Sequence, residues 1–104
     1  MQETSFGYMK SCDLGFSLAG QFEVVAFYRK GEPHEHQVDE IAICVRGSGQ
    51  VMVAHPERPA LCTGHMVKPG DCVHILANHS HWMVPNPEGL FMFIAYKETQ
   101  NGDD

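Results

Sequence analysis

The chain has 104 residues, of which 43% are hydrophobic, and it carries a formal net charge of −6. This length and composition predict one small globular domain rather than a disordered chain or several domains. The 7 Lys and Arg residues are scattered singly and no apolar run approaches the roughly 20 residues of a membrane span, so nucleic acid and membrane are not expected as partners.

Taken in chain order, the sequence predicts an N-terminal arm or edge strands over 1–20, a β domain over 21–97 and a frayed acidic tail over 98–104. No window shows helical periodicity, and Gly or Pro interrupts the chain about every ten residues, which favours an all-β fold. Runs rich in Val, Ile, Phe and Tyr predict antiparallel strands at 21–29, 40–46, 49–54, 60–64, 71–76, 81–85 and 90–97.

Turn residues separate these runs. The sequence RGSG at 46–49 predicts a tight hairpin, HPERP at 55–59 a loop, KPGD at 68–71 a type II turn, and PNPEG at 85–89 another chain reversal. Regular short strands with such connections predict a sandwich or a small barrel. The runs 40–45 and 90–96 are apolar on both alternating faces, which indicates that a second subunit or another segment covers their outer side.

The cysteines Cys12, Cys44, Cys62 and Cys72 form no Cys-x-x-Cys pair. Without an export signal at the start of the sequence we expect a cytoplasmic protein with free thiols. Cys44 and Cys72 lie in apolar runs, where a cysteine is expected to pack as a small hydrophobe.

Two stretches carry candidate metal ligands. In an extended strand alternate side chains share a face, so His34 and His36 would project to the same side about 6.6 Å apart at the backbone. Glu40 has the same parity and can add a carboxylate oxygen. The second stretch, 74–82, offers three more histidines, and parity alone does not select among them: His74, His79 and His81.

His34-x-His36-x-x-x-Glu40, followed by Gly47, resembles the first sequence motif of the cupin family, and KPGDCVHILANHSH at 68–81 resembles the second. The resemblance implies an antiparallel jelly roll, the double-stranded β-helix of cupins, with His81 as the fourth metal ligand. It also implies a homodimer, since members of that family often pair through terminal strands.

Three imidazoles and one carboxylate suit a divalent transition metal, namely Fe, Mn, Ni, Zn, Co or Cu, and leave two octahedral positions open. This donor set predicts a metalloenzyme for a small, oxygen-rich organic molecule, with dioxygenase chemistry favoured because many proteins that it resembles are oxygenases. An isomerase or lyase, in which the metal stabilises an enolate and Glu40 or a pocket tyrosine moves a proton, is the first alternative. A non-catalytic module that binds a small ligand or a metal is the second.

The remaining histidines have other interpretations. His79 could replace His81 as the ligand because the two share strand parity. His74 could donate to a ligand from outside the centre or lie in the core, and we favour the core. His55 and His65 flank loops and are expected to face solvent.

Parity with Glu40 also gives candidate pocket residues. These are Ala42, Cys44, Met83 and one face of 90–97, although for any single one of them a place in the core is the favoured interpretation. Possible substrate contacts are Tyr28, Arg46, Trp82 and Tyr96.

Overall fold

The computed structural model describes residues 2–13 and 21–97, and all regular structure in these ranges is β. The strands are β1 (Gln2–Glu3), β2 (Gly7–Asp13), β3 (Gln21–Phe27), β4 (Glu40–His55), β5 (Arg58–Val67), β6 (Cys72–Ile75) and β7 (His81–Tyr96). Every pairing is antiparallel, in the order β1-β2-β3-β7-β4-β5 with β6 also on β4. The all-β, antiparallel prediction is confirmed. Nowhere in the described ranges is there a helix with the length and apolarity needed to cross a membrane.

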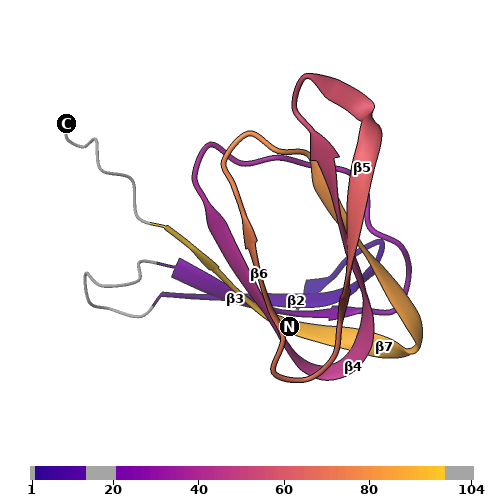
Figure 1. The fold of residues 1–104 in the computed structure, drawn as a ribbon. Coiled ribbons are helices and arrows are strands. Elements are labelled where there is room, and N and C mark those ends of the chain that lie inside the picture. Colours follow the sequence, from indigo (N-terminus) through magenta and orange to yellow (C-terminus); the bar gives the residue numbers. More distant parts are fainter. Residues whose placement is uncertain (1, 14–20, 98–104) are drawn as a thin grey trace.

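The long strands β4 and β7 form a ribbon that bends back on itself (Figure 1). In their register Glu40 pairs with Tyr96 at one end and Val53 pairs with His81 at the other. On a flat ribbon thirteen residues would separate Glu40 from His81 by about 40 Å. Their side chains instead approach to 3.3 Å, so the two halves of the ribbon must face each other across the interior.

The bend replaces two reversals that the sequence predicted, and both predictions are wrong. The chain does not turn back at 46–49 or at 85–89, because β4 and β7 each continue through these positions. The two places lie opposite each other, where the register shifts between Gly47 and Gly49 while β7 carries extra residues between Pro85 and Leu90. Extra residues in paired strands form bulges, which bend the ribbon without ending it.

The predicted turn at 68–71 is present between β5 and β6. The Asp71 amide donates to the Lys68 carbonyl at 2.9 Å, and Gly70 has a φ of 95°. A positive φ at the third position defines a type II turn and explains why glycine occupies it.

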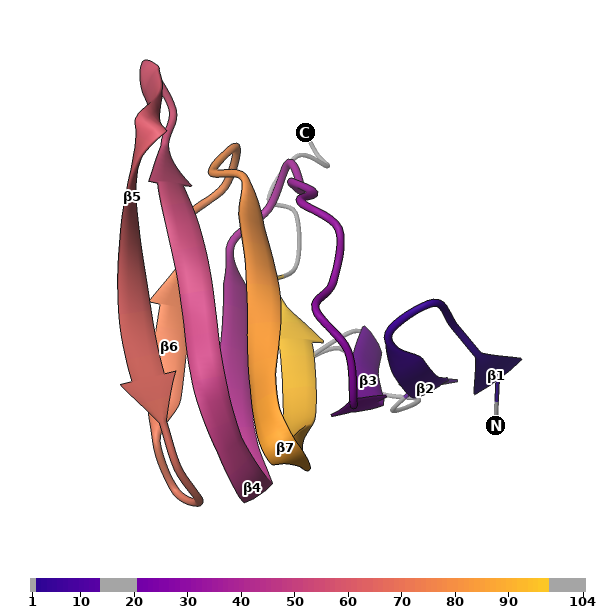
Figure 2. The ribbon, with the colours of Figure 1, turned by 90° about the vertical axis from the view of Figure 1, so that its right-hand side faces the viewer.

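Figure 2 shows β2 and β3 beside the β7 end of the ribbon, with β5 and β6 at the far side. The core lies between these elements and takes alternate residues from β3, β4 and β7, including Val25, Ala42, Cys44, Met92 and Ile94. Burial raises the pKa of the Cys44 thiol, as expected for a cysteine that packs as a hydrophobe. The same prediction is wrong for Cys72, which faces outward because β6 buries only Val73 and Ile75.

Candidate metal centre

The segment after β3 lies in an extended conformation beside the start of β7. The Gly31 amide donates to the Met83 carbonyl at 3.0 Å, and His34 and His81 exchange two backbone hydrogen bonds of 3.0 and 2.8 Å. Farther along, the His36 carbonyl accepts from the Asn78 amide at 2.8 Å. These bonds keep the segment extended, so alternate side chains project to one side.

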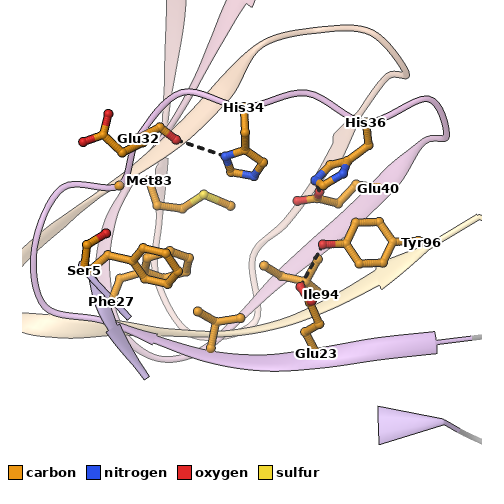
Figure 3. A pocket seen from close by; sticks show the side chains of 13 residues that line it. Ser5, Glu23, Phe27, Glu32, His34, His36, Glu40, Met83, Ile94 and Tyr96 are labelled. Carbon is orange, nitrogen blue, oxygen red and sulfur yellow. Dashed lines mark hydrogen bonds and ion pairs between the residues drawn. The ribbon is translucent and has the colours of Figure 1, made fainter. Parts of the chain in front are cut away.

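Four side chains from three parts of the chain converge there. His34 and His36 come from the extended segment, Glu40 is the first residue of β4, and His81 is the first residue of β7. One ligand atom from each lies within 4.8 Å of the others. Glu40 Oε1 is 3.3 Å from both His36 Nε2 and His81 Nε2. Figure 3 shows His34, His36 and Glu40 side by side along one wall of a pocket.

Backbone carbonyls set the orientation of two rings. His34 Nδ1 lies 3.0 Å from the Glu32 carbonyl, and His81 Nδ1 lies 3.0 Å from the His79 carbonyl. A carbonyl only accepts, so each Nδ1 carries the proton and each Nε2 keeps its lone pair. Both Nε2 atoms are thereby prepared as donors to an ion.

The buried atoms of the cluster lack hydrogen-bond partners among the described residues. This holds for His36 Nε2, His81 Nε2 and both carboxylate oxygens of Glu40. Glu40 and His81 are each only 1% exposed. Buried polar atoms are normally paired because leaving one unpaired costs about 1–3 kcal/mol. A divalent cation at the centre would satisfy all four, so the residues fit a metal.

Burial and neighbouring charge affect the two inner rings differently. Burial of the His36 ring lowers its pKa, and the nearby His34 and His81 rings lower it further against the attraction of Glu40. Burial also disfavours charge on His81, but contact with the Glu40 carboxylate and the His79 carbonyl outweighs it and raises the pKa of His81. Without a metal, the Glu40 carboxylate therefore favours a proton on His81, whereas burial disfavours one on His36.

The cluster borders a cavity of about 320 Å³, which is near the lower end for small-molecule sites. His34, His36 and Glu40 line one wall, and apolar side chains line most of the rest: Phe6, Val25, Phe27, Met83 and Ile94. Met83, Ile94 and Tyr96 line the cavity, as parity predicted, whereas Leu90 and Met92 on the same face of β7 lie in the core. Ala42 and Cys44 instead lie in the core and are completely buried.

A carboxylate and a phenol lie beside the cluster, where the centroid of the Tyr96 ring is 4.9 Å from that of His36. Only the phenol was expected from the sequence. Tyr96 donates from its hydroxyl to Glu23 Oε1 at 2.8 Å (Figure 3). Burial, followed by this contact with Glu23, raises the pKa of Tyr96 well above its usual range. Glu23 was missed because its strand lies far from the motifs, although its odd parity with Val25 and Phe27 could have placed it inward.

The turn between β1 and β2 also lines the pocket and was missed. Phe6 stacks on Phe27 with ring centroids 4.9 Å apart, and Ser5 lies beside it. Few strand cues mark this part of the sequence, so nothing local showed that it would close the cavity.

The structure separates the other candidate ligands from the cluster. His74 projects outward from β6 and its Nε2 lies 3.0 Å from Asp39 Oδ2, so the core interpretation is wrong. His79 contributes its carbonyl to His81, and its own Nδ1 lies 3.0 Å from the Ala77 carbonyl. His55 and His65 are exposed, as predicted.

Of the suggested substrate contacts, Tyr96 lines the cavity and three do not. Tyr28 packs edge-on against Phe91, and the Arg46 guanidinium lies 5.6 Å from the centre of the same ring. Trp82 is half-buried on the opposite parity from His81 and Met83.

The sequence model of the cupin family matches residues 16–104. The chain belongs to the cupin family. No curated protein matches the sequence.

Solved structures share the fold of this cupin. Oxalate decarboxylase of Bacillus subtilis, described as containing Mn(II) centres, superposes with a TM-score of 0.80 at 18% identity over 95% of this chain and 27% of its own. The capsular polysaccharide assembling protein CapF of Staphylococcus aureus superposes with a TM-score of 0.78 at 16% identity, over 95% of this chain and 28% of its own. The plu4264 protein of Photorhabdus luminescens superposes with a TM-score of 0.75 at 14% identity, over 96% of this chain and 81% of its own.

These identities support the fold and not a shared activity. The chain spans only about a quarter of oxalate decarboxylase and of CapF, at 27% and 28% of their lengths. It corresponds to most of plu4264, at 81%.

Proposed function

We propose that this cupin is a metalloenzyme that holds one divalent transition metal through His34, His36, Glu40 and His81. The observation that carries the proposal is the convergence of four ligand atoms, most of them buried and unpaired, on the wall of a small cavity. Three neutral imidazoles and one carboxylate leave the ion with a net positive charge and two open octahedral positions. When bound, the ion would act as a Lewis acid and as the place where oxygen and substrate meet.

The chain's own residues would orient the ion and exclude water. The Glu32 and His79 carbonyls fix the two ring orientations described above. Met83, Phe27 and Ile94 surround the cavity with apolar side chains. Removal of water from such a site strengthens every electrostatic interaction inside it.

Dioxygenase chemistry is the activity that we propose for the centre. Both atoms of O₂ enter the product in this reaction, so it needs no reductant site beside the metal. The open coordination positions suit bidentate chelation by a diol or keto acid, and the apolar walls suit oxygen.

Anaerobic loading with Fe(II), followed by oxygen uptake with a panel of vicinal diols, thiols and keto acids, tests this activity. We expect uptake that requires both iron and substrate and that His36→Ala abolishes. Iron bound without uptake for any compound would contradict dioxygenase activity and favour the isomerase, lyase or binding-module alternatives.

One observation favours an isomerase or lyase as the second candidate. Glu23 and Tyr96 form a carboxylate–phenol pair in the cavity beside the cluster, where a base could move a proton on a chelated substrate. Glu40 is less suited to this role because its oxygens face the ring nitrogens. Exchange of substrate protons with deuterated water in the absence of oxygen, lost in Glu23→Gln, would favour this candidate.

We further propose that the protein is a homodimer that pairs through the outer face of β3, β7 and β4. Adjacent rows on this face are apolar, with Phe22, Ala95 and Ile41 in one row and Val24, Phe93 and Ile43 in the next. Val45, 55% exposed, continues the face. These rows contain no carboxylate in a chain of net charge −6, so two copies would meet there with little repulsion.

A further inference from the structure

The pocket beside the metal centre has chemical features that restrict what it can accept. We infer that its substrate is a chelating molecule with a compact apolar body, aromatic or branched, and no more than one negative charge. This inference rests on the proposed metal site and adds the substrate class. It excludes small dianions such as dicarboxylates.

The apolar wall opposite the cluster is built from aromatic rings. Phe6 and Phe27 stack nearly parallel, with an interplanar angle of 28°, and both line the cavity. Met83 and Ile94 extend this wall. A second polar end of a substrate would lose its hydration here and find few partners.

The turn that carries Phe6 is held firmly in place. The Phe6 carbonyl accepts from the amides of Tyr28 and Arg29 at 2.6 and 3.1 Å. Thr4 closes the turn, because its hydroxyl accepts from the Gly7 amide at 3.0 Å and its own amide donates to the Gly7 carbonyl at 2.7 Å. Phe6 lies before residue 16, where the match to the family begins, whereas Phe27, Met83 and Ile94 lie within the matched range.

The charges around the cavity disfavour a second anionic group. Among the described residues that line it there is no Lys or Arg, and its carboxylates besides Glu40 are Glu23 and Glu32. The guanidinium of Arg29 donates to the Ser5 carbonyl at 2.7 Å, on the turn between β1 and β2 that carries Phe6. One negative charge on the substrate would be balanced by the ion, whereas a second would be added beside the Glu23 and Glu32 carboxylates, and the described lining contains no Lys or Arg to balance it.

Three α-keto acids that share one chelating head test the inference. Phenylpyruvate carries an apolar ring, 2-oxoglutarate carries a second carboxylate, and pyruvate is nearly the head alone. On protein loaded with Ni(II) and kept free of oxygen, isothermal titration should show phenylpyruvate binding at least about tenfold more tightly than the other two. Equal or tighter binding of 2-oxoglutarate would overturn the inference.

Two variants locate the selectivity. Phe6→Ala should lower the affinity for phenylpyruvate about tenfold and change that for pyruvate by no more than about twofold, because only the ring of phenylpyruvate would contact the aromatic wall. Phe91→Ala removes the same ring from outside the cavity, where it packs against Tyr28, and should change neither affinity. If Phe6→Ala is unstable by thermal unfolding, the ratio of phenylpyruvate to 2-oxoglutarate in the unsubstituted protein still decides.

Charge reversal at the rim gives the converse test. Glu32 is exposed and holds His34 through its backbone carbonyl, so Glu32→Lys keeps that bond. This substitution should raise the affinity for 2-oxoglutarate at least about fivefold and leave the affinity for phenylpyruvate nearly unchanged. Glu35→Lys, an equal charge change at an exposed residue that does not line the cavity, is the matched control.

A failure of the proposed metal site can be distinguished from a failure of the proposed substrate class. Protein that takes up no Ni(II) contradicts the proposed metal site and this inference with it. Protein that takes up Ni(II) but ranks the keto acids otherwise, or whose ranking is unchanged by both Phe6→Ala and Glu32→Lys, contradicts the substrate class alone.

Discussion

At the scale of single residues, the most informative feature is a buried carboxylate without a hydrogen-bond donor. Glu40 is only 1% exposed, and both oxygens lack partners among the described residues. A charge in this position is costly unless something positive accompanies it. In the proposed holoprotein the metal supplies that charge.

Removal of one inner ligand should empty the centre. His36→Ala and His81→Ala each delete a donor atom near Glu40, and we expect metal affinity to fall more than about 100-fold, beyond the range seen for residues outside the ligand sphere. His74→Ala is the matched control, since that ring contacts Asp39 on the outer side of β6. Metal analysis after dialysis, with circular dichroism for folding, gives the result. Stoichiometric metal in both ligand variants would refute the assignment.

Metal binding should weaken as the pH falls. The pKa of His81 is raised above its ordinary value of 6.5, so a proton competes with the ion for Nε2 already at a pH where a free imidazole is neutral. His36, whose pKa is lowered, competes only at more acidic pH. Titration with Ni(II) between about pH 5.5 and 8.5 should show affinity declining from above pH 6.5 downward. A flat profile across this range would contradict the raised pKa of His81.

At the scale of elements, the loop that precedes His81 is attached to the start of β4. Asp39 Oδ1 accepts from the Ala77 amide at 2.9 Å, and the Lys97 amide donates to the Asp39 carbonyl at 2.8 Å. The Ala77 amide, followed by His74, lowers the pKa of Asp39. Asp39 therefore connects the start of β4, which carries Glu40, to the loop that leads to His81 and to the end of β7.

Loss of the Asp39 side chain should loosen the metal without removing a ligand. Asp39→Ala frees the 76–80 loop, and we expect metal affinity to fall about 10–100-fold, as for other residues that orient ligands. His74→Ala breaks only one contact of Asp39 and should have a smaller effect. Competition with a chromogenic chelator measures both. Equal affinity for Asp39→Ala and the unsubstituted protein would show that the loop needs no such attachment.

The bulge that bends the β4–β7 ribbon depends on glycine. Gly47 has a φ of 78°, and a Cβ there would overlap the Gly89 carbonyl. Gly47→Ala should lower the free energy of unfolding by about 3 kcal/mol or more, combining backbone strain and a clash. Gly70→Ala has a similar φ of 95° but open space around it, so about 1 kcal/mol is expected. Urea unfolding compares them, and equal losses would contradict a role for the close contact.

At the scale of the whole molecule, oligomeric state tests the outer sheet face. Val45→Glu places a charge on the proposed interface, next to the row of Val24, Phe93 and Ile43, and should convert a dimer into a monomer. Met66→Glu, at a 77% exposed residue of β5, is the matched control and should stay dimeric. Sedimentation velocity distinguishes the two. A monomeric unsubstituted chain would contradict the proposed dimer.

The sequence predicted the fold class and the strands well because alternation and turn residues are local signals. It failed at 46–49 and 85–89, where glycine and proline accommodate bulges, since whether such residues end a strand depends on a partner strand far away. His34, His36 and Glu40 lie close in the sequence and could be grouped by parity. His81 needed the family resemblance, and Phe6 and Glu23 could not be placed because tertiary packing alone brings them to the pocket.

The curled ribbon has a consequence for how an ion would act mechanically. Its two extremities meet at Glu40 and His81, while the glycine bend lies at the opposite end. A cation coordinated there would join these extremities as a non-covalent cross-link. Separating the two ends of the β4–β7 ribbon would then require breaking coordination bonds. Removal of the ion by a chelator would then increase motion first where Glu40 and His81 meet, while the glycine bend keeps its conformation.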